Sequence, residues 1–184
     1  MSKSEVDLSL TYRFLYPRHV VLVSCAGKDG KANIITIAWS MPVSMNPPMV
    51  AISVTPQRHS YKLIEETQEF VINIPTMDIL REVLFCGRVS GKEVDKFKES
   101  GLTSAPAKIV KCPIIKECVA HLECKLHSKI VTGDHVLFVG NVLSAYVNEG
   151  VFDTKFDLRK IKPVLHIGGD EFVTVLPKTI TPSL

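Results

Sequence analysis

The segment from Thr55 to Ser60 combines hydroxyl groups with an arginine at a point where an apolar run gives way to helix-forming residues. Free N–H groups at a helix start carry partial positive charge, and Arg58 can add a bidentate contact to a phosphate group. The hydroxyl of Ser53 lies two residues upstream. These residue types fit a phosphate site. The alternative, which spacing alone favours, is an ordinary helix N-terminus with a solvated arginine.

A second group of reactive residue types suggests zinc, which thiolates and imidazoles bind: Cys112, Cys118, His121, Cys124 and His127. On a strand that rises about 3.3 Å per residue, Cys118 and Cys124 lie roughly 20 Å apart, and His121 faces away from both. The chain contains no Cys-x-x-Cys pair. We therefore predict no metal site, and expect core thiols and surface imidazoles.

Other catalytic signatures are absent from the sequence. It has no G-x-S-x-G elbow, no G-x-G-x-x-G fingerprint and no P-loop, so neither a serine hydrolase nor a common nucleotide-binding fold is indicated. Cys86 precedes Gly87 and Arg88, which leaves a functional thiol as an alternative to the favoured structural burial.

The amino-acid composition limits which classes of protein remain. The 184 residues are 46% hydrophobic and 22% charged, with a net charge of +3, which predicts a single domain over residues 1–184 with its own core. No apolar run approaches the roughly 20 residues of a spanning helix, and no basic block suggests nucleic-acid binding. Residues 1–7 carry acid where an export signal needs an apolar core, so we expect a cytoplasmic protein.

The elements that must position these residues are mostly strands. β-rich runs predict strands over residues 19–25, 32–40, 49–55, 69–74, 118–126 and 135–147. Helices are predicted over residues 60–66 and 76–84, and from a capping box at Ser90–Glu93 to Gly101. In the strand after Cys118, even positions are apolar and should face the core, whereas odd positions should face water or an interface. This order favours a mainly β fold, an antiparallel barrel or sandwich with packed helices.

An ordered series of motifs then carries a resemblance. The segments are Asn33–Ser40, Asn46–Val50, Ser53–Ser60, Phe70–Pro75, Cys86–Phe97, Gly101–Leu102, Glu117–Cys118 and Gly133–Gly140. From about Arg13 to Gly169 the chain resembles the flavin reductase-like, FMN-binding split-barrel family, and within it the flavoredoxin branch. The resemblance implies a six-stranded Greek-key split barrel with helical insertions, working as a homodimer with FMN near the subunit interface.

The resemblance also implies roles for particular residues. The isoalloxazine ring would be lined by Thr36, Ala38, Trp39, Ser40 and Met41. The ribityl chain would lie over Ser53, Val54 and Thr55. The phosphate would be held by Arg58, His59 and Ser60. The pocket would be closed by Asn73, Cys86, Gly87, Ser90, Gly91 and Lys96. The nicotinamide side would be faced by His135.

Two of these residues have purely structural alternatives, since Trp39 could be an ordinary core aromatic and His135 a surface imidazole. Lys96 or His135 could supply positive charge beside the flavin ring. Many relatives carry a tyrosine near the C-terminal Gly-Gly pair, where this chain has Phe172.

The function implied is an FMN-dependent oxidoreductase that takes electrons from NAD(P)H and passes them to a flavin or a protein redox partner. A flavoredoxin-type electron carrier without its own nicotinamide site is the alternative, and a split barrel that binds another planar cofactor is a third.

Overall fold

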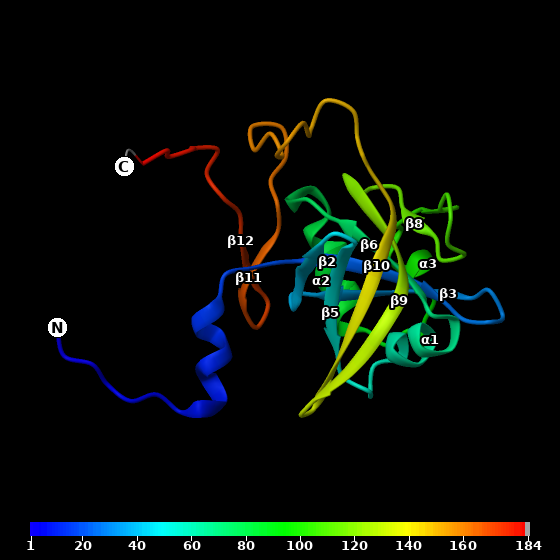
Figure 1. Cartoon of the computed structure of the whole chain (residues 1–184), viewed down its shortest axis with the longest axis horizontal. Helices are drawn as coiled ribbons and strands as arrows, with labels where there is room; N and C mark the ends of the chain where they lie inside the picture. The colour runs from blue at the N-terminus through cyan, green and yellow to red at the C-terminus, as the bar shows by residue number, and fades with distance from the viewer. Residues whose placement is uncertain (183–184) are drawn as a thin grey trace.

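A seven-stranded antiparallel sheet forms the centre of the computed structural model, which describes residues 1–182 (Figure 1). Its strands are β2 (Val21–Ala26), β3 (Ala32–Ile37), β4 (Ser40–Met45), β5 (Pro48–Val54), β6 (Glu69–Ile74), β9 (Ala120–Thr132) and β10 (His135–Val147). They pair in the order β3-β2-β6-β9-β10-β5-β4. The chain is mainly β, as predicted, and the predicted bounds of β6 and β10 are confirmed.

The two edge strands of this sheet, β3 and β4, are joined by Ala38 and Trp39 alone. The N–H of Ser53 donates to the carbonyl of Trp39 at 2.9 Å, next to the junction. The sheet therefore curls until its edges meet there, which closes a barrel. The prediction of one strand over residues 32–40 was wrong, because pairing changes from β2 to β5 at this junction. Counting β3 and β4 as one bent strand gives the six strands implied by the resemblance.

Two hydrophobic cores flank β2, every residue of which is buried. Inside the barrel, Val21 and Val23 share a core with Phe70 and Phe138. On the outer side, Leu22 joins a second core that helices cover. Such a continuous apolar run is typical of a strand that is buried on both faces.

Most of the helices lie against the outside of the barrel, namely α1 (His59–Thr67), η2 (Met77–Ile79), α2 (Leu80–Arg88) and α3 (Lys96–Ser100) (Figure 1). The 3-10 helix η1 (Leu8–Leu15) has no buried residue and projects from the barrel with the N-terminal segment. The helix predicted over residues 60–66 is α1, and the one predicted over residues 76–84 is the η2–α2 pair. The capping box predicted at Ser90 was wrong, because Asp95 caps α3 by accepting from the N–H of Lys98 at 3.2 Å.

The outer face of β9 corrects a third prediction. His121 is 4% exposed and Glu123 is fully buried, so neither odd-numbered side chain faces water. The Glu123 carboxylate accepts hydrogen bonds of 2.7–3.0 Å from the N–H groups of Lys108, Ile109 and Val110. The loop that carries those three residues covers this face of the sheet. All five cysteines are buried, as predicted.

Smaller elements complete the fold. A three-stranded sheet contains β1 (Arg18–His19), β11 (Leu165–Gly168) and β12 (Glu171–Val173), and a short ladder joins β7 (Ser104–Ala105) to β8 (Ile114–Ile115). Both terminal segments project to one side of the barrel (Figure 1). Within residues 1–182, no helix is long and apolar enough to cross a membrane.

Candidate functional site

Residues predicted to hold a phosphate meet in one pocket of about 220 Å³. It is lined by Asn33, Ile35, Gln57, Arg58, His59, Ser60, Cys86, Arg88, Ser90, Gly91 and Lys96. These side chains come from β3, from the start of α1, from α2 and from the segment that leads into α3. We call this cavity the phosphate pocket. The fold thus brings together segments that lie up to 63 residues apart, from Asn33 to Lys96.

The start of α1 forms one wall of the phosphate pocket. Arg58 is the N-cap residue of this helix, and no side chain accepts from its first N–H groups. Ser60 is buried, and its hydroxyl accepts a 2.8 Å hydrogen bond from the Asn33 amide. Open N–H groups beside an arginine are the arrangement that binds anions at a helix N-terminus.

Lys96 supplies a buried cation to the same pocket. Its side chain is 4% exposed, and Nζ donates to the carbonyls of Ile34 at 2.8 Å and Cys86 at 2.6 Å. Burial lowers the pKa of Lys96, which the nearby Cys86 thiol partly opposes. Two carbonyl partners place the ammonium group, and its third N–H can reach into the pocket.

Two buried polar atoms of this pocket have no hydrogen-bond partner among the described residues, Asn33 Oδ1 and His59 Nδ1. Burial lowers the pKa of His59, and four lysines lower it further: Lys92, Lys31, Lys96 and Lys62. The pocket is therefore electropositive and leaves polar groups for a ligand to satisfy. Gly91 packs so closely here that an added Cβ would lie 2.0 Å from Asn33 Oδ1.

A second pocket, of about 190 Å³, adjoins the first through Arg88, which lines both. Thr36, Ala38 and Gly87, three residues predicted to contact the flavin, lie in its wall. So does Phe172. Arg88 pairs with Asp170 in the turn between β11 and β12, and this hairpin contributes His166, Gly169 and Phe172 to the wall of the second pocket.

The third pocket, of about 290 Å³, contains the remaining aromatic and imidazole groups. It is lined by Arg18, Trp39, Ser40, Met41, Ala51, Ser53, Thr132, Asp134, His135 and Leu137. The rings of Trp39 and His135 lie 4.8 Å apart, and His135 Nδ1 is 2.8 Å from Asp134 Oδ1. We call this cavity the aromatic pocket. Trp39 is partly exposed here, rather than enclosed in the barrel core.

Three predicted residues lie apart from the walls of these pockets. Val54 is buried in the barrel core, and Thr55 continues the backbone into the turn before α1. Asn73 is fully buried on β6, where its amide donates to the carbonyls of Leu22 and Val71 and its Oδ1 is 2.9 Å from His121 Nδ1. The side chain of Asn73 therefore joins strands to one another.

Several side chains that line these pockets were not predicted from the sequence, among them Asn33, Arg18 and Arg88. Asn33 carried a signal, since an amide within an apolar β-run must find a buried partner. The two arginines are single basic residues in ordinary contexts, and only the fold shows that they line pockets.

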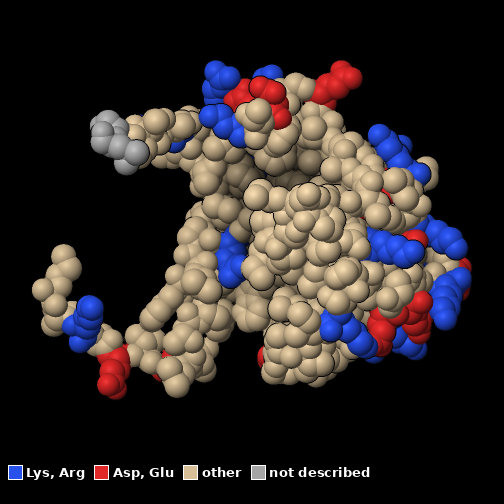
Figure 2. All heavy atoms as spheres, in the orientation of Figure 1, with Lys and Arg blue, Asp and Glu red and all other residues tan. Residues whose placement is uncertain are grey.

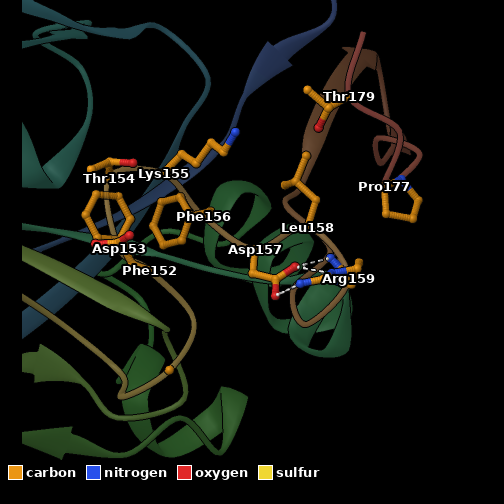
Figure 3. Close-up of a pocket in the computed structure, with 11 residues that line it drawn as sticks. Phe152, Asp153, Thr154, Lys155, Phe156, Asp157, Leu158, Arg159, Pro177 and Thr179 are labelled. Carbon is orange, nitrogen blue, oxygen red and sulfur yellow. Dashed lines mark hydrogen bonds and ion pairs between the residues drawn. The ribbon is translucent and has the colours of Figure 1, made fainter. Parts of the chain in front are cut away.

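A larger cavity of about 810 Å³ lies elsewhere, between residues 150–159 and the C-terminal segment. Figure 3 shows Phe152 and Phe156 on one side and Pro177 and Thr179 on the other, with Asp157 bound to Arg159. None of the predicted site residues lines it. We therefore base the candidate site on the three smaller pockets.

Known proteins resemble this chain over most of its length. A family model described as "Flavin reductase like domain" matches residues 12–171. An uncharacterised protein of Pyrococcus abyssi is 37% identical over 167 residues, 91% of this chain and 95% of that protein. A flavin reductase of Pseudomonas putida is 33% identical over 127 residues, 69% of this chain and 71% of that protein. The structure of flavoredoxin from Desulfovibrio vulgaris (Miyazaki F) matches with a TM-score of 0.87 at 28% identity, covering 100% of this chain and 97% of that one.

Proposed function

Because this chain belongs to the flavin reductase like domain family, we propose that it is an FMN-binding oxidoreductase that moves electrons from NAD(P)H through FMN to a flavin or a protein acceptor. A flavin-related redox role follows from the family itself. We propose three further points: which residues bind FMN, which molecule donates the electrons, and how the subunits are arranged.

The phosphate pocket is the observation that carries the proposal. The open N–H groups of α1, the guanidinium of Arg58 and the ammonium of Lys96 suit a doubly charged phosphate. The unpartnered Asn33 Oδ1 can accept from a ligand hydroxyl, such as one of the ribityl chain. These residues fit FMN. Bound FMN would supply reversible two-electron chemistry, and the protein would supply orientation and electrostatics.

The chain's own residues have distinct parts in this proposal. Arg58 and Lys96 bind the phosphate, and Thr36 and Ala38 help to form the wall beside the ring. Asp134 binds Nδ1 of His135, so Nε2 is the imidazole nitrogen that can contact a nicotinamide. His135→Ala should slow NAD(P)H oxidation while FMN stays bound. Loss of FMN with no specific effect on the rate would make His135 a cofactor residue instead.

We also propose that the protein is a homodimer. Three exposed apolar side chains, Met41, Val43 and Met45, lie on the edge strand β4, and the tip of the β9–β10 hairpin exposes Ile130 and Val131. Figure 2 shows few charges over β5 and β10, with charged side chains at the margins of that face. A second copy would cover this surface and the open side of the flavin. A monomer that still holds FMN tightly, measured by light scattering, would contradict the dimer.

A visible spectrum tests the function directly. The purified protein is given FMN, desalted, and treated without oxygen with NADH and then NADPH. Retained flavin absorbance that bleaches with either nucleotide supports the proposal. A protein that retains no flavin would remove FMN as a resident cofactor.

A flavoredoxin-type carrier is the second candidate, favoured by the similarity to the D. vulgaris flavoredoxin over the whole chain. Such a protein would receive electrons from another protein and have no use for a nicotinamide site. Flavin absorbance that bleaches with dithionite but with neither nucleotide supports this candidate.

A further inference from the structure

Arg18 is a half-buried cation without a carboxylate partner. It lies in β1, and its Nε donates to the carbonyl of Ala38 at 3.1 Å. None of the ion pairs among residues 1–182 involves it. A guanidinium has five N–H donors, so four remain beyond the one that Ala38 receives. Withdrawing a charge from water without a partner costs free energy, which a bound anion would offset.

The surroundings of Arg18 indicate what kind of anion this would be. Arg18 lines the aromatic pocket together with Trp39 and His135, whose rings lie 4.8 Å apart with an interplanar angle of 30°. Met41 and Leu137 make other parts of the wall apolar. A ligand with a flat ring and a negative group matches this combination of surfaces.

The phosphate of FMN is already provided for in the other pocket. Arg58 and Lys96 both line the phosphate pocket, and neither lines the aromatic pocket. FMN has a single phosphate group, so Arg18 is left for a second anionic ligand. The nicotinamide nucleotide of the proposed function combines a flat ring with phosphate groups.

We propose that Arg18 binds a phosphate group of the nicotinamide nucleotide and is thereby a further binding residue for the electron donor. This inference rests on the proposed function and adds a residue to it. The phosphate is either the diphosphate common to NADH and NADPH or the additional 2′-phosphate of NADPH.

Calorimetry on the FMN-loaded protein tests this assignment, with NAD⁺ and NADP⁺ as unreactive probes. The Arg18→Gln and Arg18→Lys variants are compared with Arg159→Gln. Arg159 is an exposed arginine in the loop of residues 150–159, which lines none of the three pockets. Glutamine and lysine can still donate to the Ala38 carbonyl, so the strand contact is kept. Trp39 is the only tryptophan, and its fluorescence reports whether the nucleotide enters the aromatic pocket.

We expect Arg18→Gln to raise the Kd of the nucleotide at least tenfold, Arg18→Lys to recover part of that loss, and Arg159→Gln to have no effect. The Kd of FMN should stay within twofold in all three variants. Equal weakening of NAD⁺ and NADP⁺ identifies the diphosphate, whereas weakening of NADP⁺ alone identifies the 2′-phosphate.

Three results would overturn the inference. The first is an unchanged nucleotide Kd in Arg18→Gln. The second is an equal loss of FMN affinity in that variant, which would give Arg18 a structural role through its contact with Ala38, and the third is a wild-type protein that holds FMN but binds neither nucleotide. Failure of the wild-type protein to bind FMN would instead refute the proposed function itself.

Discussion

Replacing Lys96 by methionine should damage both the fold and the phosphate pocket. The change keeps most of the apolar stem and removes the ammonium group, which donates to the carbonyls of Ile34 and Cys86 in the interior. Each carbonyl then loses a charged donor where water cannot replace it, at roughly 1–3 kcal/mol apiece. Relief from burying the ammonium offsets part of that loss. We expect the free energy of unfolding to fall by about 2–4 kcal/mol.

The same substitution should weaken FMN binding at least tenfold, because one of the two cations assigned to the phosphate is lost. The assay is urea unfolding without FMN, followed by circular dichroism, with FMN affinity measured by calorimetry. Lys98→Met is the matched control, since Lys98 lies on the same helix and is exposed. If Lys96→Met and Lys98→Met unfold at the same urea concentration and bind FMN equally, the role of Lys96 is wrong.

Three further predictions concern single residues. Arg58→Ala should weaken FMN binding by about 1.5–3 kcal/mol, roughly ten- to hundredfold by calorimetry, and unchanged affinity would move the phosphate elsewhere. Gly91→Ala should lower both thermal stability and FMN affinity, because its Cβ would collide with Asn33 Oδ1; a variant that matches the wild type would show that this loop is free to shift. Burial holds the pKa of His121 at about 4. As the pH falls below about 6.5, His121 takes up a proton in the unfolded chain but not in the folded chain. The free energy of unfolding should therefore drop by up to about 3 kcal/mol by pH 4. Urea unfolding at pH 7, 5.5 and 4 measures this drop, which His121→Gln should reduce.

Local patterns predicted elements well where one signal dominated. The strands β6 and β10 have the predicted bounds because each is a β-rich run between clear breaks. The N-terminal end of α3 was less predictable, since Ser90 and Asp95 are both good caps and tertiary packing selects Asp95. At Ala38 and Trp39 the sequence stays apolar while the strand changes partners, so only the closed barrel reveals the break.

The candidate site was predictable in part for similar reasons. The motifs of the resemblance named most side chains of the phosphate pocket, although α1 and α3 lie far apart in sequence. The strand period at His121 and Glu123 correctly separated two faces, but it carries no information about what covers each face. Arg18 had no local signal, since a lone arginine acquires meaning only from its neighbours in space.

The carboxylate of Glu123 has a consequence for motion. It binds three successive backbone N–H groups, at Lys108, Ile109 and Val110, in a stretch that belongs to no helix or strand. Close by, Ser24 donates to the carbonyl of Pro113 at 2.5 Å. Amide protons in an irregular loop usually exchange rapidly with solvent, whereas these three can exchange only when their hydrogen bonds to the carboxylate break. Exchange of these three amide protons therefore reports how often the loop separates from the Glu123 carboxylate.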